Sequence, residues 1–260
     1  MTFSNPCRGR VFQQPVKDIA DAQGDVDAFI AQYEPKTRRV PAIAARIAAR
    51  LLAANRAEEA LTTLEDADTD ARRELHPDWH RVRLDVLEAL GRAEEAQAAR
   101  WASFEKTLSE EDLRAYLKRL PDFDDLEAEE RALDHAMGYA SVHSALAFLV
   151  NWPAPERAAA LVLDRAGELD GDFYEVLTPA SEVLSAKHPL TATVLLRAMI
   201  DFSLDRARSK HYRHAARHFL AGESLAGQIG DYGNIETHAT FIARLRKKHG
   251  RKHASWSLVD

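Results

Sequence analysis

Two eight-residue segments of this chain, 36 residues apart, are identical at six of their eight positions. Residues 53–60 read AANRAEEA and residues 89–96 read ALGRAEEA. In each copy a small turn residue, Asn55 or Gly91, precedes a segment of strong helix formers. A helix before the turn and a helix after it make a hairpin, which cannot bury its own apolar face unless neighbours stack on it. The recurrence therefore predicts stacked helical hairpins.

Apolar residues elsewhere in the chain also recur at helical spacing. Residues 41–54 carry Ile or Leu at every fourth position, which gives a helix one apolar stripe. Ser109 followed by Asp112 resembles a capping box, a typical start of a helix. No convincing run alternates apolar and polar residues as a strand does. The chain is therefore expected to be all-α, with about a dozen helices joined by short loops.

Residues 189–207 differ from the other helical segments because apolar residues cover most of the helix circumference. A helix that is apolar nearly all round is buried, so this segment is predicted to be the central helix of the C-terminal half. The polar line on it is narrow, and its members Arg197 and Asp201 are spaced four apart, as in a helical ion pair. We expect a compact C-terminal helical bundle around this segment.

The repeat spacing and the charge distribution suggest how the chain is divided. A period of 36 residues is close to the 34 of a tetratricopeptide hairpin, so we expect such hairpins stacked in a right-handed solenoid. Residues 187–260 hold 13 Lys and Arg against 6 Asp and Glu, whereas residues 1–186 hold 22 against 35. We therefore predict a poorly ordered N-terminus at 1–20, an acidic repeat region at 21–186 and a basic helical region at 187–260 packed on it.

Composition excludes several classes of protein. Cys7 is the single cysteine, so neither a disulfide framework nor a thiolate zinc site is possible. The first residues lack the apolar core of a signal peptide, and the longest apolar stretches, such as residues 145–150, are too short to span a bilayer. We expect a cytoplasmic protein that does not enter a membrane.

The basic C-terminal region contains candidate contacts to anions or nucleic acid. Clustered cations on helices neutralise phosphates and release counterions, but aromatic residues are sparse here and no nucleic-acid-binding motif is present. The alternatives are that these cations dock on the acidic body, face solvent, or contact an acidic protein partner. The candidates are Lys210, Arg213, Arg217, Lys247, Lys248 and Arg251.

Three histidines, His211, His214 and His218, fall within one sector of a helix, a spacing that allows a metal site. Neighbouring cations at Lys210 and Arg217 would repel a metal ion. A solvated polar face is therefore the preferred interpretation of this histidine group, and metal binding remains the alternative.

Signatures of catalysis are missing from the sequence. There is no nucleophile elbow, no phosphate-binding glycine loop and no HExxH metalloprotease motif. The acidic segment 122–130 lacks the glycine and the final glutamate of a calcium loop, so it reads as the acidic first turn of a helix. We expect neither enzymatic activity nor a cofactor.

Two stretches carry a resemblance to a known family. They are LKRLPDFDDLEAE at residues 117–129, and residues 188–219 taken together with 241–260. They resemble an uncharacterised bacterial family of helical-repeat proteins related to the C-terminal helical regions of SWIM zinc-finger proteins. The resemblance implies an all-α, tetratricopeptide-like array. It implies no zinc site, because the CxC and CxH ligands of the SWIM motif are missing. The chain is expected to correspond to a C-terminal portion of longer relatives.

Together these features predict a non-enzymatic scaffold for protein–protein interaction. We expect a protein or peptide partner to contact surface residues near the two repeat turns. These candidate partner-binding residues are Arg56, Glu59, Arg92 and Glu95. The alternative is a nucleic-acid-associated module that uses the basic C-terminal helices.

Overall fold

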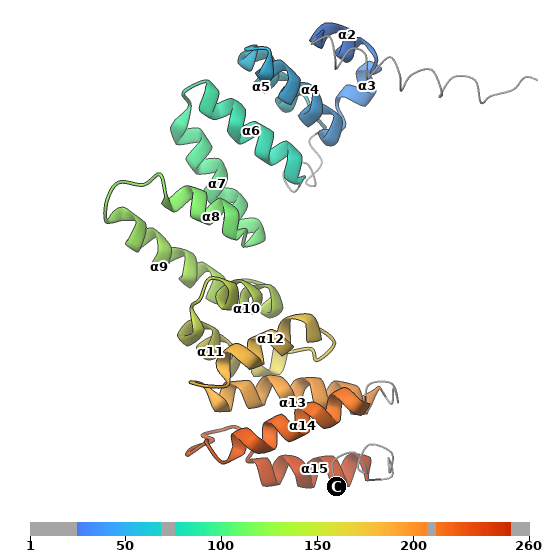
Figure 1. The fold of residues 1–260 in the computed structure, drawn as a ribbon, viewed down its shortest axis with the longest axis vertical. Helices are drawn as coiled ribbons and strands as arrows, with labels where there is room; N and C mark the ends of the chain where they lie inside the picture. The colour runs from blue at the N-terminus through green and yellow to red at the C-terminus, as the bar shows by residue number, and fades with distance from the viewer. Residues whose placement is uncertain (1–24, 69–75, 207–211, 251–260) are drawn as a thin grey trace, which may run out of the picture. The chain divides into compact units, whose positions relative to one another are not determined.

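The computed structural model describes residues 25–68, 76–206 and 212–250, and of residues 212 and 213 only the backbone. Every regular element in these ranges is a helix and none is a strand, so the all-α prediction is confirmed (Figure 1). The chain forms two compact units, Met1–Arg119 and Leu120–Asp260. The boundary predicted from charge at residue 186 falls inside the second unit, in the loop before residue 189, and stays a prediction. The segment 1–20 lies outside the described residues.

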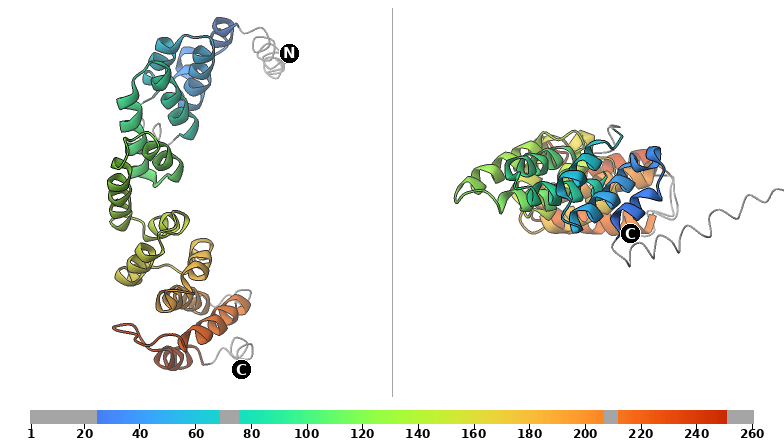
Figure 2. Two further views of the ribbon diagram at one scale, coloured as in Figure 1. Left: turned by 60° about the vertical axis from the view of Figure 1, so that its left-hand side comes forward. Right: turned by 90° about the horizontal axis from the view of Figure 1, so that it is seen from above.

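The first unit contains two long helical hairpins, coloured blue to green in Figures 1 and 2. Phe29, Ile47, Leu64 and Leu87 are among the side chains of its core. Trp79 Nε1 donates a hydrogen bond to the Leu64 carbonyl at 3.1 Å and ties the hairpins together. The helices are α2 (Val26–Ala31), α3 (Pro35–Arg38), α4 (Pro41–Ala53), α5 (Ala57–Glu65), α6 (Pro77–Ala89), α7 (Ala93–Thr107) and α8 (Glu110–Leu117).

The predicted cap at Ser109 is present and belongs to a larger polar cluster. The Asp112 N–H donates to Ser109 Oγ at 3.2 Å at the start of α8. The Asp112 carboxylate contacts His80 Nε2 at 3.0 Å and accepts from Ser103 Oγ at 2.6 Å. Burial alone would raise the pKa of Asp112, but the hydrogen bonds from His80 and Ser103 hold it below its usual value. This carboxylate joins α6, α7 and α8.

The second unit is built around α13, the helix predicted to be central. It buries 11 of its 17 residues, which confirms that prediction. It packs against α12 and α14, and Figure 2 shows these helices from two further sides. Ile200 and Leu204 of α13 join Phe219, Phe241 and Leu245 in an apolar cluster. The elements are α9 (Asp124–Met137), α10 (Val142–Asn151), α11 (Pro155–Asp164), the 3-10 turn η2 (Ala166–Glu168), α12 (Tyr174–Leu184), α13 (Pro189–Asp205), α14 (Tyr212–Ala226) and α15 (His238–His249).

The two copies of the sequence repeat form the same turn, and the structure adds a third. Arg56 and Arg92 have φ/ψ of −107°/54° and −85°/58°, and Ala154 between α10 and α11 has −109°/63°. The N–H of each of these residues donates to the carbonyl of a leucine five residues earlier, at 2.8 to 2.9 Å. This bond closes the preceding helix as a Schellman motif does. The third turn has the sequence WPAPERA, which hid it from a search for the RAEEA pattern.

An alanine follows each of these turns at the same place. It lies four residues after the turn residue, in the first part of the second helix, and is completely buried. A fully buried alanine lets two helix backbones approach closely, so larger side chains are excluded there. A buried alanine also lies four residues after His188, in the first part of α13, although the His188 N–H donates to the Leu184 carbonyl, four residues earlier instead of five. The alanines are Ala60, Ala96, Ala158 and Ala192.

Candidate functional site

A groove runs between α12 and α14, and α13 forms its floor. It consists of two adjoining cavities of about 530 and 370 Å³. Thr178 of α12 and Arg217 and His218 of α14 line both cavities, so the two form one continuous depression. A volume of this order is typical of sites that bind small molecules or anchor side chains of a partner.

The floor of the groove is apolar. Leu196, Met199 and Phe202 of α13 contribute most of it. Thr178 turns its hydroxyl to the Met199 sulfur at 3.4 Å. At one end Gly171 is packed so tightly on α13 that a Cβ atom at this position would lie 2.2 Å from the Ala198 carbonyl oxygen. The groove therefore has a rigid apolar base.

The two walls carry opposite charges. On α12 the groove residues Glu175, Thr178 and Glu182 follow a spacing of three and four, which places them on one helix face. The α14 residues Arg217 and His218 face them from the other wall. One wall is therefore acidic and the other basic.

His218 is one of the buried polar residues of this groove, with 7% of its surface exposed, and Ser181 and Ser203 are the others. Burial, the positive charge of Arg217 and the electrostatic effect of the nearby His214 lower the pKa of His218 to about 4. The imidazole is thus neutral at pH 7. Neither His218 nor Arg217 forms a hydrogen bond or ion pair with any other described residue. Within the described part of the chain, these two side chains of the basic wall thus have no partner.

Large apolar side chains lie exposed on the same two helices. Tyr174, which lines the groove, is 54% exposed, and Val183 of α12 and Leu220 of α14 are 52% and 49% exposed. Pro179 on the α12 wall has no N–H, so it cannot donate the helical hydrogen bond to the carbonyl of Glu175. The acidic wall thus presents apolar surface and a backbone acceptor without its usual helical donor.

The predicted histidine group is only partly described. His211 lies outside the described residues, His214 is exposed and His218 is buried in the groove. Among the residues with described positions, no three His, Cys, Asp or Glu side chains come together in a way that would hold a metal ion. Sequence reasoning missed the α12 wall. Its signal was the spacing of Glu175, Thr178 and Glu182, which many solvent-exposed helices share.

The residues predicted near the repeat turns bind one another. Arg56 donates to both carboxylate oxygens of Glu59 at 2.7 Å, and Arg92 binds Glu95 in the same way at 2.6 and 2.7 Å. Arg56 also reaches Asp27 at 2.9 Å. The hydrogen bonds from the arginine lower the pKa of Glu59 and likewise that of Glu95. Each Arg–Glu pair therefore braces the start of α5 or α7.

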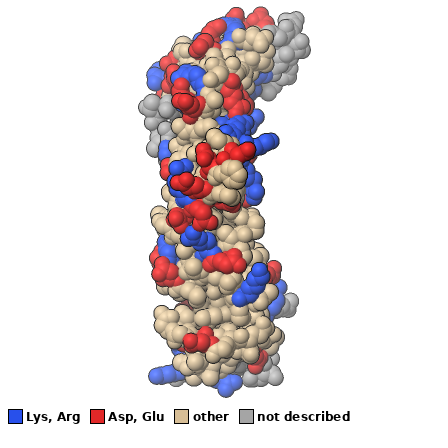
Figure 3. All heavy atoms as spheres, turned by 90° about the vertical axis from the view of Figure 1, so that its left-hand side faces the viewer, with Lys and Arg blue, Asp and Glu red and all other residues tan. Residues whose placement is uncertain are grey.

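The candidate contacts to anions or nucleic acid do not form one group in the structure. Lys210 and Arg251, and the side chain of Arg213, lie outside the described part of the chain. Lys248 forms an ion pair with Asp205 at 2.7 Å, and Lys247 is exposed on α15. On the face drawn in Figure 3, Lys and Arg alternate with Asp and Glu and do not gather into an area of one sign.

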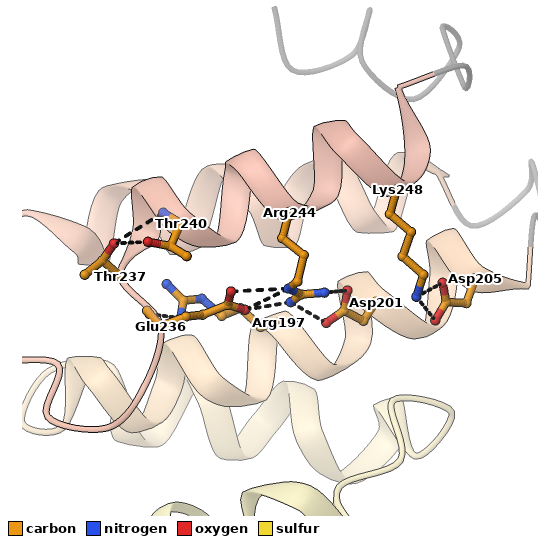
Figure 4. A network of polar contacts seen from close by, with 8 residues as sticks. All are labelled: Arg197, Asp201, Asp205, Glu236, Thr237, Thr240, Arg244 and Lys248. Atoms are coloured by element: carbon orange, nitrogen blue, oxygen red, sulfur yellow. Dashed lines mark hydrogen bonds and ion pairs between the residues drawn. The ribbon is translucent and has the colours of Figure 1, made fainter.

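Arg244 of α15 forms the densest ionic network in the second unit, shown in Figure 4. It donates to both oxygens of Asp201 at 2.9 Å and to Glu236 at 2.7 Å. The buried Arg197 donates to the Glu236 carbonyl at 2.6 Å and lies over the ring of Phe241 at 4.7 Å. The predicted pairing of Arg197 with Asp201 is therefore wrong. Asp201 binds Arg244 of α15 instead, a residue too distant in the sequence for helical spacing to indicate.

Replacing Arg244 by Met is expected to lower the free energy of unfolding by about 1–2 kcal/mol. The change keeps an apolar stem over Phe241 but leaves Asp201 and Glu236 without their cation, and partial exposure of all three groups limits the loss. Urea denaturation measures the difference, which should shrink in high salt. Lys247→Met on the same helix is the control, expected within about 0.5 kcal/mol of the parent protein. Equal stability of both variants would show that the network contributes nothing.

The His80–Asp112–Ser103 cluster of the first unit does not have the geometry of a catalytic triad. Asp112 lies between the other two and accepts a hydrogen bond from the Ser103 hydroxyl. A nucleophilic serine needs a base that removes its proton, and in such triads the histidine is that base. This cluster is therefore a structural brace between helices.

Comparison with known proteins places the chain in a family. Residues 3–258 match the model of a family of unknown function, DUF6880. The chain belongs to the DUF6880 family. No curated protein and no solved structure matches it. The match covers nearly the whole DUF6880 chain but shows no link to SWIM zinc-finger proteins, so that part of the resemblance stays a prediction. None of the described helices combines the length and the apolar character needed to cross a bilayer.

Proposed function

We propose that this DUF6880 protein is a non-enzymatic helical-repeat scaffold that binds a protein or peptide partner in the groove between α12 and α14. Its hairpins would be tetratricopeptide-like and stacked in a right-handed solenoid. The matching turns at Arg56, Arg92 and Ala154 support this repeat, as does the 34-residue spacing between the buried alanines Ala158 and Ala192. A cytoplasmic bacterial location, expected from the sequence, goes with this proposal.

The groove is the observation that carries the proposal. It combines an apolar floor on α13 with two polar residues of α14, Arg217 and His218, that have no partner among the described residues. Sites that anchor peptides commonly have this composition, because apolar contacts supply affinity and a few polar groups fix orientation. The Arg–Glu pairs at the repeat turns are satisfied internally, so the partner-binding role is assigned to the groove instead.

The alternative of nucleic-acid binding gains no specific support. Arg244 and Lys248 of α15 are occupied by Asp201, Glu236 and Asp205. Because these carboxylates neutralise the cations within the molecule, fewer positive charges remain to displace counterions from a phosphate backbone.

Blocking the groove tests the proposal. Ala221 is an exposed α14 residue that lines the groove, so Ala221→Trp fills it without disturbing the core. Ala243→Trp, at an exposed position of α15, is the matched control. A displayed library of random twelve-residue peptides is selected on the full chain, and fluorescence polarisation then measures the affinity of each selected peptide. We expect Ala221→Trp to weaken binding at least tenfold and Ala243→Trp to leave it unchanged. If no peptide is selected, or if those selected bind both variants equally well, the proposal is wrong.

A further inference from the structure

We propose that the segment bound in this groove is an acidic–apolar peptide, in which an apolar anchor side chain lies next to an Asp or Glu that contacts Arg217 and His218. This inference rests on the proposed function and adds the chemistry of the partner.

The apolar anchor follows from the shape of the larger cavity. Its floor is formed by Met199 and Phe202, and Tyr174 stands at its side with about half of its surface exposed. A Leu, Met or Phe side chain placed there removes apolar surface of both molecules from water, which is the main source of affinity. The floor holds no charged group, so a charged anchor would lose its hydration without compensation.

The acidic neighbour follows from Arg217. This guanidinium is exposed, lines both cavities, and has no ion pair with any described residue. The planar guanidinium has N–H groups that match the two oxygens of a carboxylate. We therefore expect Arg217 to bind a carboxylate of the ligand through two hydrogen bonds.

His218 points to the same chemistry. It lies nine-tenths buried beside Arg217 and lines both cavities. A neutral imidazole has one N–H donor and one acceptor, and a ligand in the groove can bind either of them. In the proposed complex, the carboxylate that binds Arg217 accepts this N–H as well. The ligand would thereby bind a polar group that has no partner among the described residues.

The opposite wall fixes the direction in which the peptide lies. Glu175 and Glu182 of α12, and Asp172 just before that helix, line the groove together with Arg217. They repel a carboxylate that approaches α12 and attract a Lys or Arg there, so an acidic residue is accepted on the α14 side only. Charge complementarity therefore selects the peptide and its orientation together.

Charge reversal tests this inference with the peptides selected above. We expect them to be enriched in Leu, Ile, Met or Phe with Asp or Glu within three residues. Arg217→Glu should weaken their binding at least tenfold, whereas Lys247→Glu, the same reversal on α15, should not change it. A peptide in which the acidic residue is replaced by Lys should lose affinity for the parent protein and regain it on Arg217→Glu. Circular dichroism and thermal melting of each variant confirm that the fold is retained.

The outcomes separate this inference from the proposed function. If selected peptides are blocked by Ala221→Trp but are indifferent to Arg217→Glu, the groove binds peptides and the acidic–apolar assignment is wrong. If binding withstands Ala221→Trp, the groove itself is not the site. His218→Gln gives a second measurement, since loss of the imidazole should weaken acidic peptides and leave their Lys-substituted forms unchanged. Competition by inorganic phosphate equal to that by the peptide would show a simple anion site and overturn the inference.

Discussion

Gly171→Ala is expected to destabilise the second unit by about 2–4 kcal/mol, although it adds a single methyl group. A Cβ at this position would lie 2.2 Å from the Ala198 carbonyl oxygen and 2.6 Å from the Phe202 Cβ. These atoms belong to the backbone and the base of a side chain of the central helix α13. They cannot rotate away as the tip of a long side chain would, so the loop or α13 must move.

Gly222→Ala is the control for this substitution. Gly222 lies inside α14, and a Cβ there meets nothing within 4 Å. Since alanine favours a helix over glycine, this variant should gain about 0.5–1 kcal/mol. Hydrogen exchange of α12 and α13 amides measures both effects in the unit concerned. Equal exchange in Gly171→Ala and the parent protein would mean that the loop shifts without cost.

The second large effect is a loss of stability in acid that depends on His218. Its pKa is about 4 in the folded protein because burial, Arg217 and His214 disfavour the charged ring, against about 6.5 in an unfolded chain. Between these values the unfolded state binds the proton and the folded state does not, so stability falls as the pH drops. The penalty is absent above about pH 7 and reaches about 3 kcal/mol near pH 4.

His218→Gln removes this titration and keeps a polar side chain. Urea denaturation of both proteins at pH 7.5 and pH 4 gives four free energies of unfolding. We expect the loss between the two pH values to be about 3 kcal/mol smaller in the variant. His143 and His238, whose pKa values burial also lowers, are present in both proteins and cancel in the comparison. An identical loss in both proteins would show that His218 titrates normally.

Local patterns in the sequence predicted local structure well. The helix at 41–54, the cap at Ser109 and the buried helix after Pro189 depend on spacing and on side chains close in sequence, and all three were confirmed. The AANRAEEA pattern predicted two hairpins. It missed the hairpin at Ala154, because the corresponding residues 151–158, NWPAPERA, share only Glu156 and Ala158 with the pattern, although the turn has the same backbone geometry.

Long-range pairing could not be predicted in the same way. Arg244 binds Asp201 from 43 residues away, and the nearer Arg197 has no part in that pair. The candidate groove posed the same difficulty. Its walls come from two helices separated by α13, so neither wall alone suggested a site, and the histidine spacing on α14 suggested metal chemistry. Only the packing of three helices brings Glu175 and Glu182 opposite Arg217.

The alanines that follow the turns affect the entropy of folding as well as the distance between helices. An alanine side chain has no rotamers to lose when it is buried, whereas a buried Met, Gln or Lys gives up about 1.5–2 kcal/mol of conformational freedom. Ala60, Ala96, Ala158 and Ala192 are all completely buried. At these four positions the helices pack together without any loss of side-chain conformational entropy. The only conformational entropy that opposes the contact there is that of the backbone.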